Sequence, residues 1–281
     1  MKEMLNLGIS PIAIPISVND RRETSSSSKG NQTKWCKDGR WVKEDFMGYE
    51  GLAECLASWV ARHTNIGDFA PIADYYQCTA VENGNSFKGC YSNNFLAEGE
   101  TCVTVQRLLD DVKGVTFDRQ LKQLSAADKV MAVVDSVIEA TDIANFGEWL
   151  TCLIEFDSLI LNEDRHLHNI AVIRRADGTF RLMTLFDNGA GFCSDTMKDF
   201  PLHMNASICI PKVKSKPFSS DFNKQVNACR LWYAKQLRVD ITADDVTPEL
   251  HANMTLYSDK EKQRAVAILR RQLVSFFDSV Q

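Results

Sequence analysis

A short polar stretch near the middle of the chain constrains most strongly what this sequence can fold into. Asp164 and Asn169 lie five positions apart in Asp-Arg-His-Leu-His-Asn, directly after an apolar segment with helical spacing. Two short strand patterns then return the chain to a second acid, Asp187, in Phe-Asp-Asn-Gly. Because a hairpin brings its two ends together, we expect Asp187 to lie beside the first two residues. This layout is typical of phosphoryl transfer, in which one acid orients the attacking hydroxyl group while an amide and a second acid hold the metal at the ATP phosphates.

A serine-rich segment lies upstream of this stretch, in front of a predicted β-hairpin. Residues 25–28 are four serines, Lys29 and Gly30 follow them, and strand patterns flank the segment on both sides. One interpretation is a disordered linker. The other is a phosphate-binding loop, because hydroxyls and backbone N–H groups between two strands can contact phosphate oxygens. Ser27, Ser28 and Gly30 are then the candidate contacts, although the sequence contains neither G-x-G-x-x-G nor a Walker sequence.

The hairpin carries a second candidate for phosphate binding, Lys43. Alternating residues on both sides of Asp38-Gly39 predict its two strands. A helix with an apolar face is predicted next, over residues 50–63. Glu50 and Glu54 flank a strip of alanines on this helix, so that either could reach the lysine. Of the two we choose Glu54.

The remaining patterns change from strands to helices along the chain. Strands are predicted at residues 74–81, 87–91, 170–174 and 180–186, and helices at 103–112, 126–140, 146–161, 222–237 and 258–279. The segment 189–220 is irregular. We expect an α+β chain of two lobes, with a β-rich first lobe (1–97) that has one main helix and a mostly helical second lobe (98–281).

Composition narrows the classes of partner and compartment. The formal net charge of −5 counts against nucleic acid as the main partner, and the lysines within residues 212–216 are expected to lie on a solvated loop. Nine cysteines are scattered without a C-x-x-C pair, which predicts reduced thiols in the cytoplasm. No apolar run is long enough to span a bilayer, and residues 5–18 lack the features of a signal peptide, so we expect no membrane partner.

Two segments of the chain resemble parts of a known family. Asp-Arg-His-Leu-His-Asn at 164–169 and Phe-Asp-Asn-Gly at 186–189 resemble the catalytic and metal-binding loops of atypical kinases. These are the HipA-like bacterial serine/threonine kinases and, more distantly, the phosphatidylinositol kinases. Residues 41–54 also resemble the HipA-like group, and within it the compact CtkA-type kinases are the most similar. The resemblance covers most of residues 25–237, although only the central stretch is specific.

The resemblance implies a two-lobed protein-kinase-like fold and a role for each candidate residue. Asp164 would orient the substrate hydroxyl group, Asn169 and Asp187 would bind Mg²⁺, and Lys43 would bind the ATP phosphates. His166 lies where ordinary kinases have a lysine that faces the γ-phosphate. Its imidazole is either catalytic or a packed structural side chain. The implied acceptor is a protein serine or threonine, while a lipid or small-molecule hydroxyl remains an alternative.

Two further functions remain open at this point. Asp164, His166 and His168 form an Asp-x-His-x-His run that could hold zinc or manganese in a metal-dependent hydrolase. That interpretation leaves Lys43 and Asp187 without a role. The other alternative is a non-catalytic module that binds nucleotide. The resemblance also implies that the enzyme phosphorylates its own serine loop, in which case the added charge would repel ATP and lower activity.

Overall fold

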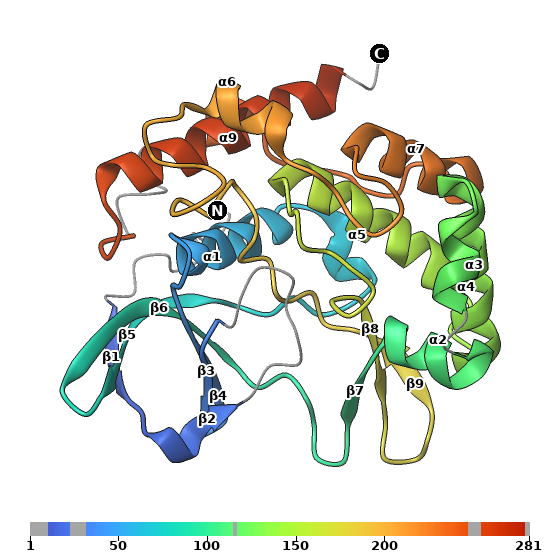
Figure 1. Ribbon diagram of the computed structural model, residues 1–281, viewed down its shortest axis with the longest axis horizontal. Helices are drawn as coiled ribbons and strands as arrows, with labels where there is room; N and C mark the ends of the chain where they lie inside the picture. Colours follow the sequence, from blue (N-terminus) through green and yellow to red (C-terminus); the bar gives the residue numbers. More distant parts are fainter. Residues whose placement is uncertain (1–10, 23–31, 115–116, 247–253, 279–281) are drawn as a thin grey trace.

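The computed structural model describes residues 11–22, 32–114, 117–246 and 254–278 (Figure 1). Within these residues the N-terminal part forms a six-stranded sheet in the order β1-β5-β6-β4-β3-β2. β1 pairs in parallel with β5, and the other neighbours are antiparallel. The strands are β1 (Ile12–Pro15), β2 (Arg21–Arg22), β3 (Lys34–Lys37), β4 (Arg40–Glu44), β5 (Tyr76–Glu82) and β6 (Asn85–Asn93).

The predicted hairpin is formed by β3 and β4. Asp38 and Gly39 both have positive φ, at 48° and 72°, as the tight turns that suit the twist of a hairpin require. The register sets Trp35 opposite Val42, and both side chains are fully buried on one face of the sheet. Because side chains alternate along a strand, Lys43 points to the opposite face, toward the main helix of this lobe.

That helix, α1 (Glu50–Ala61), packs on β5 and β6. Ten of its twelve residues are buried, because the sheet covers one side and the C-terminal part of the chain covers the other. Figure 1 shows α1 between the strands and the later helices. An acid on this helix, Glu54, is therefore buried as well, with 1% of its surface exposed.

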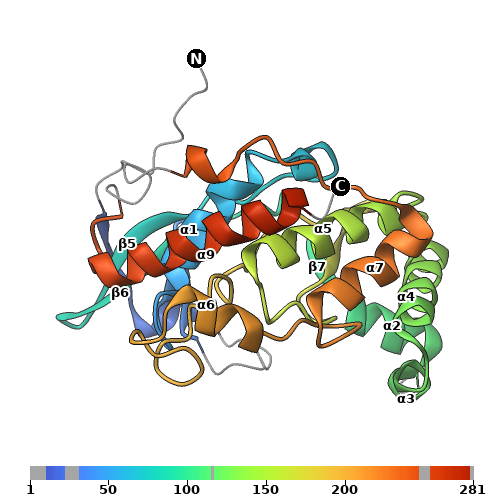
Figure 2. The same ribbon diagram turned by 90° about the horizontal axis from the view of Figure 1, so that it is seen from above.

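The C-terminal part is mostly helical and contains a small antiparallel sheet in the order β7-β8-β9. Figure 2 shows α9 lying across the molecule beside α1 and α5. The strands are β7 (Thr101–Thr104), β8 (Ala171–Arg174) and β9 (Phe180–Leu182), and the α-helices are α2 (Val105–Lys113), α3 (Phe117–Lys122), α4 (Ala126–Thr141), α5 (Phe146–Ile160), α6 (Ala206–Cys209), α7 (Phe222–Tyr233) and α9 (Asp259–Asp278). Short 3₁₀ helices are η1 (Val18–Asp20), η2 (Asn65–Asp68), η3 (Ile210–Lys212) and η4 (Ala243–Asp245).

Three predicted elements have different bounds because tertiary contacts replace the regular pattern. The helix predicted over 103–112 begins as β7, which pairs with β8. The strand predicted over 180–186 ends at Leu182, since the N–H of Leu185 donates to the carbonyl of Pro71 instead. The helix predicted over 222–237 ends at Tyr233, and the N–H groups of residues 236 and 237 donate to the Glu155 carboxylate.

Two general expectations concern cysteines and membranes. All nine cysteines are free, and most of them are buried. Over the described ranges, no helix has both the length and the apolar character that crossing a membrane requires.

Candidate active site

A buried lysine lies between two carboxylates in the contact between the two parts of the chain. The Lys43 Nζ atom donates to Glu54 Oε1 at 2.5 Å, to Asp187 Oδ1 at 2.7 Å and to Tyr75 Oη at 3.2 Å. Only 5% of the Lys43 surface is exposed. Burial opposes the charge of Lys43, but the carboxylates of Asp187 and Glu54 outweigh it and raise the pKa of Lys43. Lys43 is therefore a buried, charged ammonium group that both carboxylates share, and Lys34 also approaches Asp187 at 3.6 Å.

The two glutamates of α1 have different partners. Glu50 accepts hydrogen bonds from the backbone N–H groups of Met47 at 2.6 Å and Gly48 at 3.0 Å, so it stabilises the loop in front of the helix. Glu54 pairs with Lys43 through one oxygen and accepts from the Asn188 N–H at 2.7 Å through the other. The chosen glutamate is thus the one that links the lysine to the loop after Asp187.

Asp187 lies on that loop in a left-handed conformation, with a φ of 59°. Aspartate tolerates this region better than most side chains do. Burial opposes its ionisation, but Lys34 at 3.6 Å and Lys43 at 2.7 Å outweigh it and hold the pKa of Asp187 well below its usual range. The side chain keeps 22% of its surface exposed. The carboxylate is therefore ionised at neutral pH and open on one side.

Asp164 and Asn169 lie in the loop that follows α5. The helix ends where Leu161 adopts a left-handed φ of 54°, and this turns the chain into the loop. The Asn162 side chain accepts from the Asp164 N–H at 3.2 Å, and the Asn169 amide Nδ2 donates to the Asp164 carbonyl at 2.8 Å. The loop is thus closed on itself, and the Oδ1 atom of Asn169 is left as an acceptor.

Arg165 holds this loop against the loop of Asp187. The residue is 1% exposed, and its guanidinium forms two hydrogen bonds to the Asp157 carboxylate, at 2.9 and 3.1 Å. It also donates to Asn188 Oδ1 at 2.6 Å, to the Phe186 carbonyl at 3.1 Å and to the Asn169 carbonyl at 3.3 Å. One buried side chain therefore joins α5 to both loops.

Two further side chains approach the Asp164 carboxylate. Lys216 Nζ donates to Asp164 Oδ1 at 3.0 Å from a segment 52 positions later in the chain. His166 Nε2 lies 3.8 Å from the same oxygen, and its buried Nδ1 atom has no hydrogen-bond partner among the described residues. Burial and the charge of Lys216 lower the pKa of His166, although Asp164 opposes the shift. The imidazole is therefore neutral at pH 7.

The described residues bring together Lys43, Glu54 and Asp187, and they place Asp164, His166 and Asn169 on one loop. Ser27, Ser28 and Gly30 lie outside the described residues. Sequence reasoning did not identify the other side chains of the site, which are Lys34, Tyr75, Asp157, Arg165, Asn188 and Lys216. Arg165 is the one with a local signal, since an arginine directly after the candidate acid Asp164, eight positions beyond a helical aspartate, suggests a buried pair.

The donor set suits Mg²⁺ with a nucleotide better than it suits zinc. Asp187 and Asn169 offer oxygen atoms, which Mg²⁺ prefers, and Lys43 supplies a positive charge for phosphates. Among the described residues no group of three or more His, Cys, Asp or Glu side chains is placed to hold a metal ion. Asp164, His166 and His168, the set considered for a hydrolase, thus do not form such a group.

Comparisons with known proteins identify the fold. No protein-family model matches the chain, and no curated protein matches it. Among solved structures, the crystal structure of the Helicobacter pylori proinflammatory kinase CtkA is similar, with a TM-score of 0.60 and 12% sequence identity. The match covers 94% of this chain and 96% of that chain. The chain therefore has the fold of this kinase, which confirms both the predicted α+β architecture and the predicted likeness to CtkA-type kinases.

Proposed function

We propose that this protein is an ATP- and Mg²⁺-dependent kinase that transfers phosphate to serine or threonine hydroxyls of a protein. The observation that carries the proposal is the buried Lys43, which is shared between Glu54 and Asp187. Glu54 holds this lysine in place beside the Asp187 carboxylate, which is partly open and which Lys34 also approaches at 3.6 Å. Such an arrangement suits a bound cation and a phosphate group.

Each part of the site would have a separate task. Lys43 would bind the phosphates, held in place by Glu54, while Asn169 and Asp187 would bind Mg²⁺, which neutralises charge on the phosphates when it is present. Asp164 would accept a hydrogen bond from the acceptor hydroxyl group and orient it for attack. ATP would lie between the lobes 1–97 and 98–281, where these side chains meet.

Asp164→Asn tests the proposal most directly. We expect phosphoryl transfer from labelled Mg·ATP to fall about 10²- to 10⁴-fold, the usual contribution of a positioned acid or base. Mg·ATP affinity, measured by calorimetry, should be retained, because this side chain faces the acceptor. Asp111→Asn, at a site on α2 whose side chain is 69% exposed, is the matched control. Near-wild-type transfer by the Asp164→Asn variant, or a wild-type protein that does not bind Mg·ATP, would overturn the proposal.

The same proposal includes a catalytic role for His166 and self-phosphorylation of the serine segment at residues 25–28. The neutral imidazole would donate a hydrogen bond near the transferred phosphate, so that His166→Ala should slow transfer while His166→Gln retains part of it.

Mass spectrometry after incubation with Mg·ATP should find phosphate on residues 25–28. Labelling of other sites without this segment would exclude it as a self-regulatory switch.

The cysteines favour a cytoplasmic location. Nine free thiols, most of them buried, suit a reducing compartment.

A further inference from the structure

The segment that ends at Lys216 presents its lysines on one side. Residues 212–216 are Lys-Val-Lys-Ser-Lys. Val213 and Ser215 are buried, at 8% and 3% exposure, whereas Lys212 and Lys214 are exposed. Val213 is in an extended conformation, and in an extended chain alternate side chains point the same way about 7 Å apart. Lys214 and Lys216 therefore alternate with the buried side chains, Lys212 precedes them at the end of η3, and Lys216 contacts Asp164. We call these three residues the lysine row.

Buried contacts hold this segment in place. The Gln225 side chain of α7 is fully buried and donates to the Lys216 carbonyl at 2.9 Å. It also accepts hydrogen bonds from the N–H groups of Phe218 at 2.9 Å and Ser219 at 3.3 Å. The Ser215 N–H donates to the Ser220 carbonyl at 3.2 Å. The lysines are thus presented from a backbone that is already ordered, which lowers the entropy lost on binding.

A groove runs along this row. One cavity of about 760 Å³ is lined by Leu161 near the catalytic loop, by Lys212, Lys214 and Lys224, and by Asp221. Asp221 accepts a hydrogen bond from the backbone N–H of residue 224 and caps α7. No carboxylate of the described residues forms an ion pair with the side chains of these three lysines. The groove is consequently a basic surface on a protein whose formal net charge is −5.

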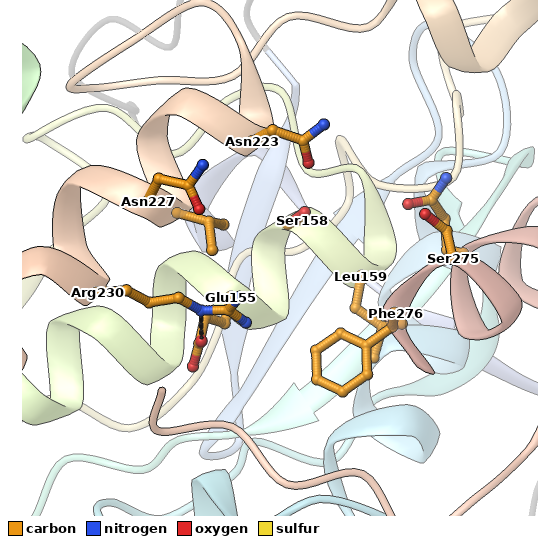
Figure 3. A pocket seen from close by; sticks show the side chains of 10 residues that line it. Glu155, Ser158, Leu159, Asn223, Asn227, Arg230, Ser275 and Phe276 are labelled. Atoms are coloured by element: carbon orange, nitrogen blue, oxygen red, sulfur yellow. Dashed lines mark hydrogen bonds and ion pairs between the residues drawn. The ribbon is translucent and has the colours of Figure 1, made fainter. Parts of the chain in front are cut away.

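The groove continues into a second cavity of about 380 Å³, shown in Figure 3. The two cavities share Ser158, Asn223, Gln272 and Ser275. Arg230 lies at the far end, where the Glu155 carboxylate pairs with it at 2.5 Å. Amide and hydroxyl side chains of this kind both donate and accept hydrogen bonds, which suits the backbone of an extended peptide. The groove thus combines a basic end, which reaches Leu161 just before the loop of Asp164, with a polar end that is closed by the Arg230–Glu155 ion pair.

We propose that this groove binds the acceptor protein through an extended acidic segment. With the serine or threonine at Asp164, carboxylates two and four residues away face Lys214 and Lys212. This inference rests on the proposed kinase activity and adds a class of substrate to it. The match is mainly one of charge, and the alternation of buried and lysine side chains over residues 213–216 follows the interval of an extended peptide. Complementary charge of this kind determines partner choice and association rate.

Synthetic peptides test the inference in the full-length protein with Mg·ATP. One serine peptide carries glutamates at two and four residues on either side of the serine, and its counterpart carries glutamines there. We expect kcat/KM for the glutamate peptide to be about tenfold higher, since each exposed pair contributes little and several act together. Lys214→Glu and, as a second variant, Lys212→Glu should remove most of this preference and leave glutamine-peptide phosphorylation unchanged. Lys122→Glu, an exposed site on α3, is the control.

A binding measurement separates failure of the groove from failure of the kinase. Fluorescence anisotropy of the labelled glutamate peptide, at low and high salt, reports docking without phosphoryl transfer. Tighter binding of the glutamate peptide than of the glutamine peptide, weakened in the Lys214→Glu variant, supports the inference. Equal binding or equal phosphorylation of the two peptides overturns it, and so does equally tight binding of a single-stranded oligouridylate. If the protein binds the glutamate peptide more tightly than the glutamine peptide but does not bind Mg·ATP, the kinase proposal is overturned and the inference about the groove is not.

Discussion

Two buried charge networks lie within one site, and they differ in how completely their cations are paired. Arg165 donates to the Asp157 carboxylate, to the Asn188 side chain and to two backbone carbonyls, so its guanidinium is saturated by partners that are all buried or part of the backbone. Lys43 instead divides one charge between Glu54 and Asp187. The second of these carboxylates keeps 22% of its side-chain surface exposed.

The difference separates stability from activity. A saturated network can only hold its neighbours together, and the cost of burying its charges is offset by the number of hydrogen bonds that it makes. The Lys43 network has an open side at Asp187, where Lys34 and Lys43 can exchange partners with a bound cation or phosphate. We infer that the Arg165 network positions the loops and that the Lys43 network binds nucleotide.

The largest expected effect is on stability, from Arg165→Met. Loss of the guanidinium leaves the Asp157 carboxylate buried without its counterion, which should lower the free energy of unfolding by about 3–5 kcal/mol in urea titration. The double variant with Asp157→Leu should recover part of this loss. Arg107→Met, at a side chain that is 78% exposed, should change stability by less than about 0.5 kcal/mol. A loss below about 1 kcal/mol for Arg165→Met would contradict the positioning role.

The sequence could predict those residues of the site that carry a local signal. Asp164, Asn169 and Asp187 follow from spacing along one stretch, and Lys43 follows from a hairpin pattern with its turn. The face of a single helix leaves Glu50 and Glu54 as partners of the strand lysine, and the contact in the structure is with Glu54. These are local signals, and the structure brings Lys43, Glu54 and Asp187 into contact and joins Asn169 to Asp164 on one loop.

The remaining partners come from distant segments that carry no local pattern. Lys216 reaches Asp164 across 52 positions, through a loop whose course depends on the buried Gln225. Tyr75 reaches Lys43 from the position just before β5, 32 residues later in the chain. The sequence predicts a solvated loop at residues 212–216. It does not indicate the burial of Val213 and Ser215, because this burial arises from tertiary packing. Pairings of this kind depend on topology, which periodicity does not determine.

Asp187→Asn tests the second network with a smaller effect. Lys43 keeps Glu54 as its partner, so the loss of stability without ligand should be smaller than that of Arg165→Met. The gain in unfolding free energy on adding Mg·ATP, about 2.7 kcal/mol at a hundredfold excess over Kd, should be lost in thermal or urea unfolding. Asp157→Asn is the matched variant, and it should be destabilised yet keep the nucleotide gain. Equal gains in the two variants would remove the distinction between the networks.

Glu54→Gln should weaken the use of ATP about tenfold, through a higher KM. An amide pairs more weakly with Lys43 than a carboxylate does, so the lysine is held less firmly and KM for ATP is expected to rise by roughly that factor. Glu50→Gln is the control on the same helix, because Glu50 caps the loop at Met47 and Gly48 and does not contact the lysine. It should lower stability and leave KM unchanged. The opposite result would assign the lysine partner to Glu50.

The smallest expected effect is on the free energy of unfolding at acidic pH. Its dependence on pH should have opposite signs for Asp187 and Asp157. Lys34 and Lys43 overcome burial and lower the pKa of Asp187 in the folded protein, so the folded state binds fewer protons there than the unfolded chain does. Its contribution is complete above the unfolded pKa of about 3.9 and is lost as the pH falls through the lower folded value. Burial raises the pKa of Asp157 despite Arg165, so its ionisation costs stability as the pH rises above about 4.

Urea unfolding of the wild type, Asp187→Asn and Asp157→Asn between pH 3 and 7 measures these signs. The difference in unfolding free energy between wild type and Asp187→Asn should grow as the pH rises from 3, since only the wild type gains an ionised carboxylate beside two lysines. The difference between wild type and Asp157→Asn should shrink over the same range. Parallel curves would mean that the two aspartates experience the same balance of burial and charge, which the open side of Asp187 and the complete burial of Asp157 argue against.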